Sequence, residues 1–367
     1  MSEPIITNTN ISNNNITFTL EGVNVSIANG IRRTIISDIP VVVFKTYPEN
    51  MNDATIIKNT TRMNNEIIKQ RLSCIPIHID DMEFPIETYI LEINEDNKDE
   101  NVKIITTEDF KIKNIQNDKY LPRDQVKKIF PPNDITKQYI DFVRLRPRIS
   151  EQIPGESLHM TCKFSISDAK DDGMFNTTHT CVFNNTPDND KIDSEWSVKE
   201  AEIKKEKGDI NMNIERDNFI MLQGQRIFVP DSFDFTIDSI GIYKPLSLIE
   251  KGCLIIIKKI EKFIEDIQNN TDLISTSEST MNNCFDIKLV NEDYTIGKIL
   301  EYYLYSEFFT SGKLSYCGFK KFHPHDNFSI IRIAYNNTEN TSNITNDLII
   351  ISNNAIQTYK KILEQLQ

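Results

Sequence analysis

One pattern occurs twice in this chain, and it constrains the fold more than any other feature. In the first copy, residues 16–20 alternate apolar and polar side chains like a half-buried strand, and Ser26 can cap a helix that ends before Pro40. In the second copy, residues 285–289 alternate and Thr295 can cap the next helix. The apolar stripes that follow are Ile27, Ala28, Ile31 and Ile35 in the first helix, and Ile296, Gly297, Leu300 and Leu304 in the second. Placing Ser26 on Thr295 aligns both stripes without a gap, which indicates an internal duplication.

Each copy is completed by another alternating strand and a long amphipathic helix. The strand patterns lie at residues 233–237 and 328–335, and the helical patterns run from about 246 to 267 and from about 347 to 366. The sequence therefore predicts an α+β fold with two related half-units, each an antiparallel sheet plus helices, in one chain.

A long insertion separates the parts of the first half-unit. Its strand-like pieces at 88–93, 102–107 and 157–167 predict a separate β-rich domain, and the polar, charge-dense stretch 186–218 predicts an exposed or mobile loop. Residues 268–283 are rich in Ser, Thr and Asn and predict a flexible linker. The predicted boundaries are 1–45 and 229–267 for the first half-unit, 46–228 for the inserted domain, 268–283 for the linker and 284–367 for the second half-unit.

The overall charge excludes one class of function. With 41 Lys and Arg against 54 Asp and Glu, the net charge is −13, which argues against wrapping of nucleic acid by the whole surface. We therefore expect only indirect contact with DNA or RNA. No apolar run approaches the ~20 residues that span a bilayer, and no secretory signal pattern is present at the N-terminus, so we expect no membrane association.

No constellation of residues indicates an active site. The chain contains no phosphate-binding glycine loop, no G-x-S-x-G turn and no H-E-x-x-H motif, and we predict no catalytic residue. The six cysteines form no C-x-x-C pair, which favours buried free thiols in a reducing compartment. An alternative is a metal-dependent hydrolase that uses Cys162, His179 and Cys181, but the spacing favours structural roles and no metal or cofactor. His323 and His325 flank a proline and are better explained as a turn.

The two short helices instead have the character of a pairing interface. Each combines an apolar stripe with small residues, Ala28 and Gly30 in the first and Gly297 in the second, so the helices can approach closely and share a core. Arg32 and Arg33 stand beside the first stripe and point about 100° apart. They cannot share one salt bridge, so one reaches a partner or a distant carboxylate, or both are simply solvated.

Several segments resemble one family of proteins. Residues 24–40, with Arg-Arg followed by Ser-Asp-Ile-Pro, resemble the assembly motif of the alpha-type subunits of DNA-dependent RNA polymerase. Residues 64–76 and 233–241 are similar to two further segments of that family, which includes bacterial alpha, archaeal D and the third nuclear subunit. The second half-unit is similar to the small partner, archaeal L or the eleventh nuclear subunit, in the segments 291–300, 317–324 and 331–333.

The resemblance implies a D-like and an L-like dimerisation domain fused in one non-catalytic polymerase subunit. Its implied partners are the two largest catalytic subunits, contacted through Arg32 and Arg33, and small polymerase subunits. Such a fusion resembles the polymerases of large cytoplasmic DNA viruses, which implies the host cytoplasm and the virion, or otherwise an intracellular site shared with the polymerase. Tyr294 and Lys298 depart from the His and Asn of the small-partner pattern. Residues 88–113 contain no cysteine, so the zinc and iron–sulfur centres of some relatives do not carry over.

Overall fold

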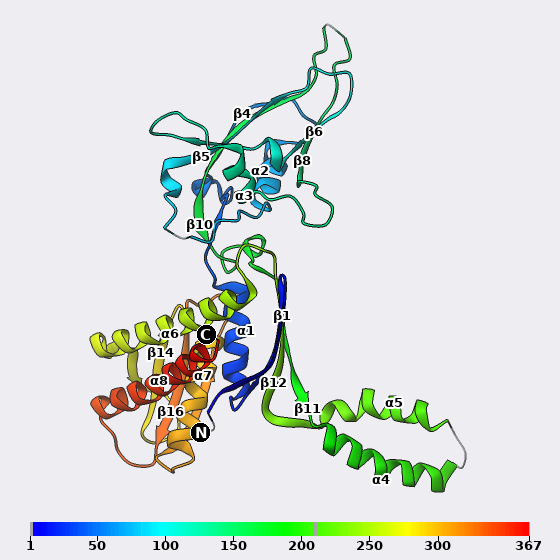
Figure 1. Ribbon diagram of the computed structural model, residues 1–367. Coiled ribbons are helices and arrows are strands. Elements are labelled where there is room, and N and C mark those ends of the chain that lie inside the picture. The colour runs from blue at the N-terminus through cyan, green and yellow to red at the C-terminus, as the bar shows by residue number, and fades with distance from the viewer. Residues whose placement is uncertain (1–2, 82, 151, 208–210, 367) are drawn as a thin grey trace. The chain divides into compact units, whose positions relative to one another are not determined.

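The computed structural model describes residues 3–81, 83–150, 152–207 and 211–366 (Figure 1). The chain packs into two compact units, and each is described by itself. The first unit consists of Met1–Ile35, Thr180–Asp238 and Pro245–Gln367, and the second of Ile36–His179 and Ser239–Lys244. The second unit thus interrupts the first in sequence. Residues 36–45, predicted for the first half-unit, belong to the second unit, and residues 180–228, predicted for the inserted domain, belong to the first unit. The predicted domain boundaries stay a prediction.

The first unit contains two four-stranded antiparallel sheets with the same strand order. One sheet has the order β1-β2-β12-β11 and the other β13-β14-β16-β15. In each sheet, the strand that precedes a short helix pairs with the strand that precedes a long helix. The strands are β1 (Ile5–Ser12), β2 (Asn15–Glu21), β11 (Thr178–Pro187), β12 (Phe228–Ser239), β13 (Ile274–Thr276), β14 (Cys284–Val290), β15 (Leu314–Lys320) and β16 (Phe328–Tyr335).

The predicted strand and helix patterns of both copies are confirmed as elements. The helices are α1 (Val25–Ser37), α6 (Pro245–Asn269), α7 (Tyr294–Leu304), which a π-helical turn at Tyr305–Phe309 extends, and α8 (Thr341–Glu364). We call β1, β2, α1, β12 and α6 the N-terminal half, and β13 to β16 with α7 and α8 the C-terminal half. The long helices α6 and α8 pack side by side, and α7 packs on α8 (Figure 1).

The two halves bury equivalent helix positions. When Ile31 is placed on Leu300, every buried residue of α1 falls on a buried residue of α7. When Ile260 is placed on Tyr359, every buried residue of α6 up to Phe263 falls on a buried residue of α8. Ile267 falls on Leu366, which is also buried and follows α8. The duplicated sequence pattern is therefore accompanied by a duplicated pattern of burial.

The predicted loop at 186–218 was wrong for the residues that the structure describes. Helix α4 (Asn189–Lys207) and helix α5 (Met212–Leu222) occupy most of it, while residues 208–210 lie outside the described residues. The helices bury a small core of Ile192, Trp196, Ile203 and Phe219, in which the Trp196 and Phe219 rings lie 5.5 Å apart. The dense charge concealed the helical spacing of these few apolar residues.

The predicted flexible linker was also wrong in part. Helix α6 continues to Asn269, a 3-10 turn follows at Thr271–Leu273, and β13 then pairs with β14 through Ile274 and Ile287. A polar strand at a sheet edge carries little apolar periodicity, so the sequence pattern did not show it.

The second unit is rich in short strands. Its elements are β3 (Val41–Val43), β4 (Ala54–Asn59), α2 (Asn65–Ser73), β5 (Tyr89–Asp96), β6 (Lys103–Thr106), β7 (Lys111–Asn114), α3 (Arg123–Ile129), β8 (Asp141–Leu145), β9 (Ser157–Lys163) and β10 (Ser165–Ser167). A four-stranded sheet β4-β9-β5-β7 and the pairs β10-β3 and β6-β8 surround one apolar core. The three strands predicted from the sequence correspond to β5, β6 and the β9–β10 segment. Among the described helices, none has both the length and the apolar character needed to cross a membrane.

Candidate pairing interface

The apolar stripe of α1 is fully buried. Ile27, Ala28, Ile31 and Ile35 are each at most 2% exposed. Part of this stripe packs on α6 of the same half, because a Cβ at Gly252 would lie 2.9 Å from Ile35 Cγ1. The stripe therefore belongs first to the core of its own half.

The stripe of α7 is buried to the same extent. Ile296, Leu300 and Leu304 have no exposed surface. Gly297, predicted as the small residue that lets the two helices approach, faces its own half instead, since a Cβ there would lie 2.0 Å from the Phe319 ring of β15. Its absence of a side chain makes room for an aromatic ring of the same sheet.

The close approach between the halves occurs at Gly30. A Cβ at this position would lie 2.9 Å from Ile299 Cδ1 on α7 and 2.9 Å from the Tyr359 hydroxyl on α8. The Tyr359 hydroxyl also donates a buried hydrogen bond of 3.3 Å to the Ile27 carbonyl oxygen. Burial raises the pKa of Tyr359 well above its ordinary value, and nearby Cys253 of α6 adds to the shift. The sequence patterns gave no indication that Ile299 or Tyr359 contacts α1.

In both short helices, the capping residue lies two residues before the predicted cap. Asn24 Oδ1 accepts a hydrogen bond from Ser26 N (2.9 Å), and Asp293 Oδ1 accepts one from Thr295 N (3.0 Å). Ser26 and Thr295 were thus wrongly predicted as N-caps, because their hydroxyls lie inside the first turn. The displacement is the same in both copies, so Asn24 and Asp293 are equivalent positions.

The two arginines of α1 have separate surroundings. Arg32 Nε donates to Asn29 Oδ1 on the same helix (2.9 Å) and lies close enough to Cys181 to oppose the burial that raises the pKa of that thiol to about 12. Arg33 Nη2 lies 3.2 Å from Oδ2 of Asp293, so its guanidinium reaches the C-terminal half. The sequence left open whether either arginine reaches a partner protein, a distant carboxylate or only solvent. Arg33 reaches a distant carboxylate.

A second ion pair crosses between the halves beside the first. Lys259 Nζ of α6 lies 3.6 Å from Glu292 Oε2, and both side chains are about one fifth exposed. Two cations of the N-terminal half therefore meet two consecutive carboxylates of the C-terminal half. No sequence pattern connected these residues, because the paired positions are far apart in the chain.

The residues of the hydrolase alternative form no metal site in the described part of the chain. Burial raises the pKa of the Cys162 thiol strongly, and that of Cys181 to about 12, which disfavours the thiolate that binds a metal. Among residues 3–81, 83–150, 152–207 and 211–366, no group of three or more His, Cys, Asp or Glu side chains is arranged to hold a metal ion.

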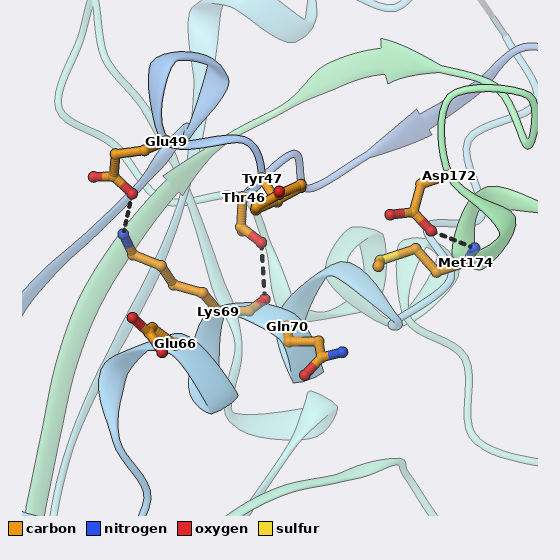
Figure 2. A pocket seen from close by; sticks show the side chains of 8 residues that line it. All are labelled: Thr46, Tyr47, Glu49, Glu66, Lys69, Gln70, Asp172 and Met174. Atoms are coloured by element: carbon orange, nitrogen blue, oxygen red, sulfur yellow. Dashed lines mark hydrogen bonds and ion pairs between the residues drawn. The ribbon is translucent and has the colours of Figure 1, made fainter. Parts of the chain in front are cut away.

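A pocket of about 610 Å³ lies in the second unit, and the described contacts of the residues that line it show no catalytic pairing (Figure 2). Lys69 points toward Glu49, with 3.8 Å between Nζ and Oε2, and the Thr46 hydroxyl donates to the Lys69 carbonyl oxygen. Asp172 accepts from the Met174 backbone N–H. These contacts are an ion pair, a side-chain hydrogen bond to a carbonyl of α2 and the N-cap of a 3-10 turn, all of them structural.

Comparison with known proteins gives two matches. Residues 17–260, more than half of the chain, match the model of a family described as the RNA polymerase Rpb3/Rpb11 dimerisation domain. A stretch of 74 residues is 36% identical to a Dictyostelium discoideum protein named DNA-directed RNA polymerases I and III subunit rpac1. That stretch covers 20% of this chain and 19% of the relative, so it spans about a fifth of the length of either protein.

Proposed function

This chain belongs to the RNA polymerase Rpb3/Rpb11 dimerisation domain family, and we propose that it is a non-catalytic assembly-platform subunit of a multisubunit DNA-directed RNA polymerase. The observation that carries the proposal is the packing of two topologically equivalent halves on each other within one chain. A pairing surface made of buried apolar side chains, a close glycine contact and two ion pairs suits a scaffold.

We propose further that the chain combines both members of an Rpb3/Rpb11-type pair. The family match runs from residue 17 to residue 260, so it covers the second unit and the N-terminal half from β2 to most of α6. Three features support the same assignment for the C-terminal half: the identical strand order, the equivalent burial of α7 and α8, and the equivalent caps at Asn24 and Asp293. A fusion of this kind would suit the polymerase of a large cytoplasmic DNA virus, acting in the host cytoplasm and carried in the virion.

The platform would bind the two largest catalytic subunits, and Arg32 is the residue that we assign to this contact. Arg33 is engaged with Asp293, whereas the terminal nitrogens of Arg32 have no carboxylate partner among the described residues. A half-buried guanidinium held through Nε keeps a planar donor pair available for a partner carboxylate.

The test is substitution of Arg32 by Ala in a tagged chain, with Arg226→Ala, an exposed arginine of the same unit, as the matched control. Arg32→Ala should leave the chain folded and weaken capture of the large subunits, and polymerase that still assembles should elongate at a near-normal rate. Normal capture with a collapsed elongation rate would contradict the platform role and indicate a catalytic one.

A further inference from the structure

Two neighbouring ion pairs run from cations of the N-terminal half to carboxylates of the C-terminal half, whereas a more exposed pair, Lys361 Nζ with Glu3 Oε1 at 2.6 Å, runs the other way next to β1. Arg33 and Lys259 belong to the N-terminal half, and their partners Asp293 and Glu292 belong to the C-terminal half. We call these four residues the charge clamp. Two related halves that pack on each other form a pseudo-symmetric interface, in which each contact has a counterpart with the two halves exchanged.

The counterpart positions in the clamp carry no charge. The alignment of α1 with α7 places Asn24 at the position of Asp293, Val23 at that of Glu292 and Tyr302 at that of Arg33. The alignment of α6 with α8 places Thr358 at the position of Lys259. The reverse contacts would therefore be Tyr302 with Asn24 and Thr358 with Val23.

This asymmetry bears on which halves can pair. If two N-terminal halves paired, each Arg33 would meet Asn24, whose Oδ1 already accepts from Ser26 N and whose remaining amide group is a donor. The guanidinium would then lose the Asp293 carboxylate and lie beside the positive end of α1. If two C-terminal halves paired, Glu292 and Asp293 would lose both cations. Like pairing would thus lose both ion pairs, and such electrostatic discrimination is a recognised means of specificity.

Asp293 performs two tasks with its two oxygens. Oδ1 caps α7 through Thr295 N, and Oδ2 takes the Arg33 guanidinium. Asparagine at this position would keep the cap and lose the ion pair, which would reproduce the situation at Asn24. The capping side chains of the two halves therefore differ only in their second terminal group, a carboxylate oxygen in Asp293 and an amide nitrogen in Asn24.

We propose that the charge clamp of Arg33, Lys259, Glu292 and Asp293 determines that an N-terminal half pairs with a C-terminal half and not with its like. The inference rests on the proposed role of the two halves as a fused pair. The Arg33–Asp293 pair is about one third exposed on each side (37% and 34%), so salt should weaken it, and the Lys259–Glu292 pair is more shielded.

The test uses the full chain with a specific protease site inserted between Asn269 and Asn270, both exposed, so that β13 stays with the C-terminal half. After cleavage, the N-terminal fragment is immobilised and the release rate of the C-terminal fragment is measured at about 0.05 and 0.5 M salt. Lys259→Glu and Glu292→Lys should each speed release by roughly tenfold at low salt, and the double reversal should restore the original rate within about threefold. Asp293→Asn should speed release severalfold and reduce its salt dependence.

A matched control removes two exposed charges from the same half outside the clamp. Asp272→Asn with Glu278→Gln should leave the release rate unchanged. Specificity itself is read from two differently tagged copies of the cleaved protein. The N-terminal fragments should not capture each other in the original chain, and Arg33→Gln with Lys259→Gln should raise that capture severalfold.

The outcomes separate this inference from the proposed function. If the halves stay together but charge reversal changes neither release nor mutual capture, the clamp is refuted and the platform is not. If the two halves of the original chain separate at once at low salt, the paired-half proposal itself fails. Capture of large polymerase subunits by the uncut chain is independent of both results.

Discussion

Gly30 is the position at which a single methyl group should perturb the packing of the two halves. In Gly30→Ala, the new Cβ would lie 2.9 Å from both Ile299 Cδ1 and the Tyr359 hydroxyl, closer than ordinary van der Waals contact. Overpacking of this kind costs about 1–3 kcal/mol. Displacement of Tyr359 would also weaken its hydrogen bond to the Ile27 carbonyl oxygen, which contributes about 1 kcal/mol.

Helix propensity acts against this destabilisation. Alanine is more favourable than glycine inside a helix by about 1 kcal/mol. The net expectation is a destabilisation of about 1–3 kcal/mol, which lowers the midpoint of thermal unfolding by roughly 2–10 °C in a unit of this size. Circular dichroism measures the midpoint, and hydrogen exchange of α1 and α8 localises the change.

A second substitution tests the cause of the effect. Tyr359→Phe removes one of the two crowding atoms, so the penalty of Gly30→Ala should be about 1 kcal/mol smaller in the Tyr359→Phe background. Gly173→Ala is the control, since nothing lies within 4 Å of a Cβ there. If Gly30→Ala instead raised the midpoint by the helix-propensity gain alone, the helices would not approach at this point.

Three further predictions concern the same unit. Ile31→Asp and Leu300→Asp each place a carboxylate at a position with at most 1% exposure, so each should cost several kcal/mol in urea unfolding and abolish assembly. Stability should fall as the pH rises from about 10 toward 12. Burial raises the pKa of Tyr303 to about 12 and that of Tyr359 well above its ordinary 10. The folded chain therefore keeps protons that the unfolded chain has lost in this range, which favours unfolding as the pH rises. Tyr359→Phe should make this alkaline loss shallower in urea titrations, and an unchanged slope would contradict the assigned burial. Sedimentation of the isolated chain should give a monomer, whereas a dimer that persists on dilution would contradict pairing within the chain.

The elements with long apolar periodicity were predictable from the sequence, and the contacts between them were not. The stripes of α1, α6, α7 and α8 each follow one helical face, and their residues are buried as the spacing requires. The helices α4 and α5 escaped prediction because four apolar side chains in a charged segment suffice for their small core.

The site itself depends on pairs that no local pattern connects. Arg33 and Asp293, like Gly30 and Tyr359, are brought together only when the halves pack. The equivalence of the two copies was visible in the sequence, but the replacement of Asn24 by Asp293 acquires meaning only once Arg33 is seen beside it. Gly297 shows the converse, since a small residue predicted for the interface instead accommodates Phe319 of its own sheet.

The most direct test of the platform role is capture of a tagged copy of the full chain under mild conditions, followed by mass spectrometry of the polypeptides that accompany it. We expect the two largest subunits of a DNA-directed RNA polymerase to be recovered together with the chain in equal amounts. Recovery of the intact, folded chain without any polymerase subunit, from cells in which that polymerase is active, would contradict it.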